Sequence, residues 1–137
     1  MAEAALVDAG FIVALVSRRD THHRWATSQA KRFNPPWRTC EAVLSEAFHL
    51  LGTPGQPVLI TLLRRAAIVP ALDLTDNLDS VLRLLEKYSN VPMGLADACL
   101  VRMTELLTDP VVLTTDGDFH VYRRHGRQVV PCLLPSS

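Results

Sequence analysis

The sequence predicts an α/β fold, a three-layer α/β/α sandwich with a mostly parallel central sheet. Short apolar runs without alternation recur along the chain, as expected for strands that are buried on both faces of a parallel sheet. Longer segments between them show the three- and four-residue spacing of amphipathic helices. With 137 residues, 48% of them hydrophobic, the chain is expected to form one domain over residues 1–137.

Four apolar runs are predicted to be the strands of this sheet. They cover residues 4–7, 67–69, 111–113 and 128–130. Each run is bounded by Pro, Gly, Asp or Thr and is too short to form a helix. The strands alternate with helical segments, which is the arrangement expected when helical crossovers join parallel strands.

Helices are predicted over residues 21–33, 40–51, 56–65 and 94–107. The clearest helical pattern follows the second strand, where apolar residues step by three and four: Leu78, Val81, Leu82, Leu85 and Tyr88. Thr75 or Asp76 is the expected cap of this helix. Glycine and proline in residues 52–55, and the prolines at 35 and 36, are expected to break helices.

The apolar beginning of the chain is not expected to be a signal peptide, because Asp8 interrupts it and no basic residue precedes it. No run reaches the roughly 18 uninterrupted apolar residues of a membrane helix. A cytosolic protein with no membrane-spanning segment is therefore expected. Cys40, Cys99 and Cys132 lack the paired spacing of a zinc site or a disulfide framework, so we interpret them as small buried hydrophobic residues.

Two carboxylates follow predicted strands directly. Asp8 comes after the run at residues 4–7, and Asp116 follows residues 111–113 through two threonines. Ligand sites in open parallel sheets form beyond the carboxyl ends of the strands. Both residues are therefore candidates for a functional site.

Two further carboxylates lie on predicted helices among apolar neighbours. Glu46 shares a helix face with Ala42, Val43 and Leu50, and Asp97 shares one with Met93, Leu100 and Val101. A carboxylate on an apolar face is costly unless it is compensated. Asp97 also lies in the first turn of its helix, where the helix dipole favours an anion.

Gathered together, these four carboxylates would repel one another and raise one another's pKa values unless a cation neutralised them. Oxygen ligands without matching Cys or His favour Mg²⁺ or Mn²⁺ over Zn²⁺. The chain has 14 basic and 14 acidic residues, so four acids in one site leave 14 basic against 10 acidic residues elsewhere, a mild attraction for phosphate. The alternative is that each acid only caps a helix or makes a turn bond.

Four segments resemble, in the right order, the acidic motifs of the PIN-domain family. They are Leu6-Val7-Asp8-Ala9-Gly10, Val43-Leu44-Ser45-Glu46-Ala47, Gly94-Leu95-Ala96-Asp97-Ala98 and Leu113-Thr114-Thr115-Asp116-Gly117-Asp118-Phe119. The resemblance implies a compact α/β/α sandwich and a ribonuclease that uses Mg²⁺ or Mn²⁺. It also implies frequent dimerisation and, for short VapC-type toxins of toxin-antitoxin systems, a cognate antitoxin partner.

The site residues carry over from this resemblance one by one. Asp8, Glu46 and Asp97 match the family's core metal-binding acids, and Asp116 matches the acid that completes the site. Thr114 would support the site by hydrogen bonding. Gly10 would let the backbone pass close to the site, because glycine has no side chain. Asp118 receives no role.

The expected activity is hydrolysis of RNA by a metal-activated water, without a covalent nucleophile. Two alternatives remain. A metal-dependent phosphatase would want a second Asp at position 10, where this chain has Gly10. A module that binds RNA or a protein without cutting it would keep the fold but would not need the acids.

Surface contacts are predicted in two places. Basic residues expected to meet RNA are Arg18, Arg19, Arg123, Arg124, His125 and Arg127. Apolar residues that would suit an antitoxin groove or a dimer face are Phe33, Trp37 and Val58. Which RNA is cut does not follow from the sequence.

Overall fold

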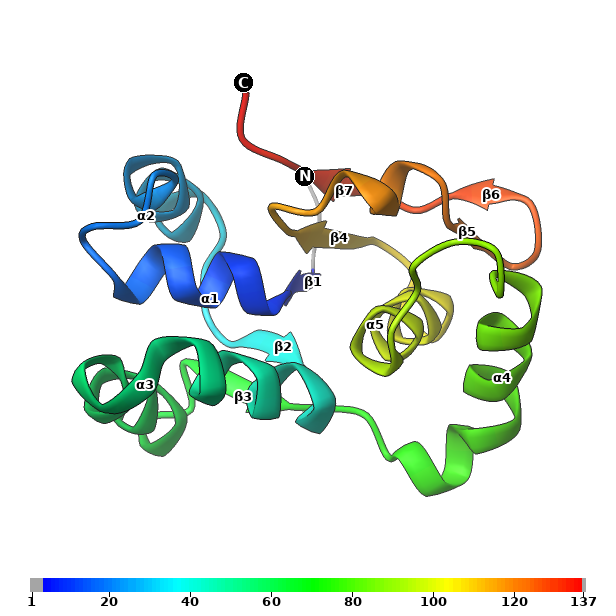
Figure 1. The fold of residues 1–137 in the computed structure, drawn as a ribbon, viewed down its shortest axis with the longest axis horizontal. Helices are drawn as coiled ribbons and strands as arrows, with labels where there is room; N and C mark the ends of the chain where they lie inside the picture. Colours follow the sequence, from blue (N-terminus) through cyan, green and yellow to red (C-terminus); the bar gives the residue numbers. More distant parts are fainter. Residues whose placement is uncertain (1–3, 137) are drawn as a thin grey trace.

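The computed structural model describes residues 4–136, which form a parallel sheet flanked by helices (Figure 1). Five strands lie in the order β3-β2-β1-β4-β7, and each neighbouring pair is parallel. Their bounds are Ala4–Val7 for β1, Trp37–Thr39 for β2, Ile68–Pro70 for β3, Pro110–Leu113 for β4 and Cys132–Leu133 for β7. The predicted α/β class with a mostly parallel sheet is confirmed.

Five α-helices surround the sheet. They are α1 (Ala9–Val16), α2 (His23–Arg32), α3 (Glu41–Arg64), α4 (Leu74–Lys87) and α5 (Leu95–Glu105). Helix α1 packs against α2 and α3, whereas α4 packs against α5 on the opposite side of the sheet (Figure 1). The sheet thus lies between two helical layers, as the three-layer prediction requires.

The predicted strands at residues 4–7 and 111–113 are confirmed, and the one at 67–69 is displaced by a single residue to Ile68–Pro70. Strand β2 was not predicted, because Arg38 interrupts the apolar run between Trp37 and Thr39. It pairs with the central strand through Leu6 and Arg38. Pairing with neighbouring strands, and not the local sequence, therefore determines that this segment is a strand.

The predicted sheet strand at residues 128–130 is wrong. Strand β6 (Gln128–Val129) pairs antiparallel with β5 (Arg123–Arg124) in a separate two-stranded hairpin. Both residues of β6 are exposed, which does not suit the interior of a covered sheet. The edge strand is instead β7, which follows Pro131 and pairs with β4.

Helix α1 has no counterpart among the predicted elements, whereas the break expected at residues 52–55 is confirmed as a kink. Gly52 has a φ of 61°, a left-handed conformation that glycine adopts readily, and α3 continues beyond it. The predicted caps Thr75 and Asp76 are wrong for α4. Its cap is Asp73, whose side chain accepts a hydrogen bond from the Asp76 amide, because the helix begins before its apolar pattern becomes clear.

The strand order predicts where along the sheet a binding site can form. Strand β1 lies between β2 and β4, and the chain returns past it to form β4, so a crevice is expected at the carboxyl ends of these strands. The Asp8 amide donates to Leu113 O at 3.1 Å, and Thr39 Oγ1 donates to Val7 O at 2.8 Å. These bonds hold the ends of the three strands together.

The core is apolar and contains two of the three cysteines. Cys40 and Cys99 are buried, as predicted, whereas Cys132 is half-buried. Within residues 4–136, no helix combines the length and the apolar composition needed to cross a membrane.

Candidate active site

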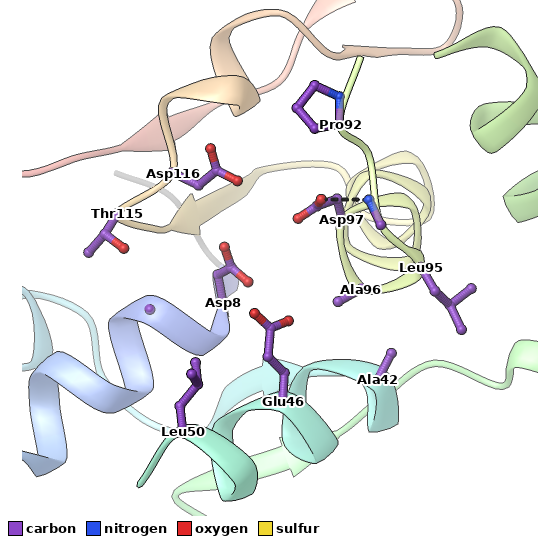
Figure 2. Close-up of a pocket in the computed structure, with 12 residues that line it drawn as sticks. Asp8, Ala42, Glu46, Leu50, Pro92, Leu95, Ala96, Asp97, Thr115 and Asp116 are labelled. Carbon is purple, nitrogen blue, oxygen red and sulfur yellow. Dashed lines mark hydrogen bonds between the residues drawn. The ribbon is translucent and has the colours of Figure 1, made fainter. Parts of the chain in front are cut away.

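The four predicted acids line one pocket of about 580 Å³. Asp8 follows β1, Glu46 lies on α3, Asp97 lies in the first turn of α5 and Asp116 follows β4. Their carboxylates point toward a common space from four different elements (Figure 2). The fold thus brings together residues that are up to 108 positions apart in the sequence, Asp8 and Asp116 being the most distant.

Asp8 is the most firmly held of these acids. Its Oδ1 accepts a hydrogen bond from the Ala9 amide at 2.7 Å, which caps α1, and its Oδ2 accepts one from Thr114 Oγ1 at 2.8 Å. The Thr114 hydroxyl also accepts a hydrogen bond from the Asp116 amide at 2.9 Å. One buried hydroxyl therefore links two of the acids, in the supporting position expected for Thr114.

Asp116 and Asp97 also bind nearby backbone. Asp116 Oδ1 accepts a hydrogen bond from the Asp118 amide at 2.9 Å, and Asp97 Oδ2 accepts one from the Gly94 amide at 2.9 Å. The capping interpretation is therefore correct for these residues. Each bond occupies one carboxylate oxygen, so capping and cation binding are compatible.

Burial is not uniform among the acids. Asp8 is buried, Asp97 and Asp116 are half-buried, and Glu46 is exposed. The expectation of a buried apolar face around Glu46 is wrong, because Leu50, one turn further along the same face, is 56% exposed. Glu46 instead lies at the rim of the pocket, where its side chain extends toward Asp8 (Figure 2).

Burial raises the pKa of Asp8 above its ordinary value of 3.8. The hydrogen bonds from Thr114 and Ala9 oppose this effect, and the negative charges of Glu46 and Asp116 add to it. Ionisation of the buried Asp8 carboxylate therefore carries a desolvation cost.

Burial also raises the pKa of Asp97, to about 6. The hydrogen bond from the Gly94 amide lowers it, whereas the charges of Asp8, Asp116 and Asp118 raise it further. The acids at the pocket thus repel one another, as predicted for a group of carboxylates without a neutralising cation.

The residues present fit a hard divalent cation in their chemistry. Over residues 4–136, no three Asp, Glu, His or Cys side chains stand close enough to hold a metal ion as they are placed. The pocket acids nevertheless offer oxygen donors alone, which suit Mg²⁺ or Mn²⁺. Their mutual repulsion is the electrostatic condition that a cation would relieve, and Glu46, which is exposed, is the acid with the most freedom to move toward one.

Gly10 lies where α1 meets the loop after β4. A Cβ atom on Gly10 would overlap Thr115 Oγ1, because the two atoms would be closer than nonbonded atoms can approach. The close backbone approach expected of Gly10 is therefore present. Thr115 lines the pocket too, a role that the sequence analysis missed although this residue directly precedes Asp116.

Two of the arginines expected to contact RNA serve the fold instead. The Arg124 guanidinium donates to the carbonyl oxygens of Thr104 and Leu107 near the end of α5. The Arg123 guanidinium donates to His120 O at 2.8 Å. These bonds argue against the predicted RNA contact for both residues, whereas Arg18 and Arg19 are exposed and their contact stays a prediction.

Of the three apolar residues predicted to lie on the surface, two are buried and one is exposed. Phe33 and Trp37 are buried, and Trp37 Nε1 donates to Phe33 O at 2.7 Å. Their predicted role in a dimer face or antitoxin groove is wrong, because Trp37 belongs to β2 and packs in the core. Val58 is exposed.

Comparison with known proteins agrees with this arrangement. A family model described as a PIN domain matches residues 5–124. The crystal structure of VapC20 from Mycobacterium tuberculosis, described as a toxin that cleaves the sarcin-ricin loop, is similar with a TM-score of 0.77 and 19% sequence identity. The similarity covers 86% of this chain and 94% of that one. A search of curated proteins found no match.

Proposed function

Since this chain belongs to the PIN-domain family, we propose that it is a metal-dependent endoribonuclease and the toxin of a VapC-type toxin-antitoxin pair. The observation that carries the proposal is the meeting of Asp8, Glu46, Asp97 and Asp116 in one pocket at the carboxyl ends of β1 and β4. The similarity in fold to VapC20, a toxin that cleaves RNA, supports it.

Mg²⁺ or Mn²⁺ would be held by Asp8, Glu46, Asp97 and Asp116. The chemistry that such an ion supplies is a water activated at neutral pH and stabilisation of the charge on the leaving oxygen. Thr114 fixes the Asp8 carboxylate and the Asp116 backbone, so these two residues would form the least mobile part of the metal site. The pocket of about 580 Å³ leaves room beside the acids for a phosphodiester of the RNA.

The proposal names RNA and a cognate antitoxin as the partners of this chain. Homodimerisation remains a prediction from the family resemblance, and a cytosolic location remains a prediction from the sequence of the N-terminal run. The residue at position 10 argues against a phosphatase. The second Asp that such an enzyme would have there would collide with Thr115.

Cleavage of a mixed RNA pool tests this proposal. The purified chain, free of antitoxin, is incubated with Mg²⁺, with Mn²⁺ and with a chelator, beside the Asp97→Asn and Asp76→Asn variants. Asp76 is a matched control because it is an exposed aspartate on α4 and does not line the pocket. We expect discrete cuts only with metal, lost in Asp97→Asn and retained in Asp76→Asn.

Three outcomes would contradict the proposal. Equal cleavage in chelator excludes the metal-dependent reaction. Equal cleavage by Asp97→Asn excludes this acid from the site. Binding of RNA without any cleavage favours the non-catalytic module, and hydrolysis of a small phosphomonoester alone favours the phosphatase.

A further inference from the structure

A buried tyrosine hydroxyl lies behind the acid pocket and has no role in the site described so far. Tyr122 is fully buried, and its ring packs edge-on against Tyr88 and Phe119, with centroids 5.3 Å from each. The aromatic cluster fixes where the phenol points. A buried hydroxyl requires a hydrogen-bond partner, so its surroundings indicate its use.

The Tyr122 hydroxyl faces the segment that holds Asp97. It donates to Pro92 O at 3.4 Å, a long hydrogen bond, and Pro92 lines the acid pocket. Two residues further along, the Gly94 amide donates to Asp97 Oδ2 at 2.9 Å (Figure 2). The hydroxyl is thus connected to the short turn that orients the Asp97 carboxylate.

The same hydroxyl keeps its proton. Burial raises the pKa of Tyr122, and the nearby carboxylates of Asp97, Asp118 and Asp116 raise it further. The phenol therefore stays a hydrogen-bond donor toward Pro92 O over the whole working pH range.

We infer that Tyr122 is a positioning residue for Asp97, whose hydroxyl holds the turn from Pro92 to Gly94 and thereby orients the Asp97 carboxylate toward a divalent cation. The inference rests on the proposed function, because it concerns a carboxylate assigned to the metal. Hydrogen-bond donors behind a metal ligand fix its orientation, and their removal typically weakens metal affinity. Tyr122 itself touches neither metal nor RNA.

Tyr88 provides a matched control in the same cluster. It is buried and its ring contacts that of Tyr122, but its hydroxyl accepts a hydrogen bond from the Arg123 amide at 2.8 Å. Tyr→Phe at either position removes one oxygen from the same aromatic cluster. A purely structural effect should therefore appear in both variants, and an effect on the metal only in Tyr122→Phe.

Calorimetric titration with Mn²⁺ alone, without RNA, measures the predicted effect. We expect Tyr122→Phe to weaken Mn²⁺ binding roughly tenfold and Tyr88→Phe to change it by less than about twofold. Cleavage by Tyr122→Phe should recover at saturating Mn²⁺. Unchanged binding by Tyr122→Phe, or equal weakening in both variants, overturns the inference. Absence of Mn²⁺ binding by the wild-type chain overturns the proposed function as well.

A second measurement does not depend on a folded Tyr122 variant. The chain contains two tyrosines, so labelling tyrosine with ¹³C at Cζ gives two signals, which Tyr88→Phe assigns. Titration of the wild-type chain with Mg²⁺ should shift the Tyr122 signal and leave the Tyr88 signal in place. A Tyr122 signal that does not move while Mg²⁺ binds refutes the inference.

Discussion

Replacing Thr114 by valine tests the hydrogen bonds that connect the acids. The Thr114 side chain is fully buried, and its hydroxyl donates to Asp8 Oδ2 and accepts from the Asp116 amide. Valine keeps the shape but leaves both groups without a partner. A buried polar group left unpaired costs about 1–3 kcal/mol, and more when it is charged, so two such groups should lower the free energy of unfolding by about 3–5 kcal/mol.

Urea unfolding of the metal-free protein at pH 7 measures this loss. Thr114→Ser keeps the hydroxyl and is the control, with an expected loss of about 1 kcal/mol for the missing methyl group. Because the Thr114 hydrogen bond lowers the pKa of Asp8, its removal should raise that pKa further. The deficit of Thr114→Val should therefore shrink as the pH falls and Asp8 becomes protonated. A loss below about 0.5 kcal/mol, or equal losses in both variants, refutes the reasoning.

Three further perturbations follow from the site. The pKa of Asp97 is about 6 in the folded protein against an ordinary value of 3.8, so the metal-free protein should lose stability as the pH rises between these values. Calorimetry should show a flatter pH dependence for Asp97→Asn, and an unchanged profile would contradict the assignment. Gly10→Ala should lower the free energy of unfolding by about 1–3 kcal/mol through its collision with Thr115, and Thr115→Ala should restore most of it. Additive losses in that double variant would exclude the collision. Arg124→Gln should lower the free energy of unfolding by about 2 kcal/mol, because two carbonyl oxygens lose their donor, while RNA affinity in a fluorescence polarisation assay stays within about twofold. Weaker RNA binding with unchanged stability would restore Arg124 to the RNA surface.

The sequence allows the fold class to be predicted where strands are continuous and apolar. Strands β1 and β4 are buried at every position, so their local sequence suffices. Strand β2 has Arg38 in its middle and β7 has only two residues. Both segments become strands by pairing with a neighbouring strand of the sheet. This is a tertiary effect that the local sequence does not reveal.

In the site, as in the sheet, some features could be predicted from the local sequence and others could not. The acids could be predicted because a carboxylate after a buried strand or beside apolar helix residues is unusual. Contacts near them also come from segments that the sequence does not place together, as the hydrogen bond from the Tyr122 hydroxyl to Pro92 O illustrates. The sequence shows the charge of Arg124 but not its partners, which lie at the end of α5.

The competing interpretations of the acids, helix caps or metal ligands, describe one arrangement. Asp8, Asp97 and Asp116 each give an oxygen to a backbone amide, which fixes these carboxylates relative to α1, α5 and the loop after β4. Burial is the main cause of the raised pKa values of Asp8 and Asp97, and because fixed carboxylates cannot turn away from one another, their charges add to it. The caps thus hold negative charge in place at the pocket, and under the proposed function a divalent cation would turn this cost into binding free energy.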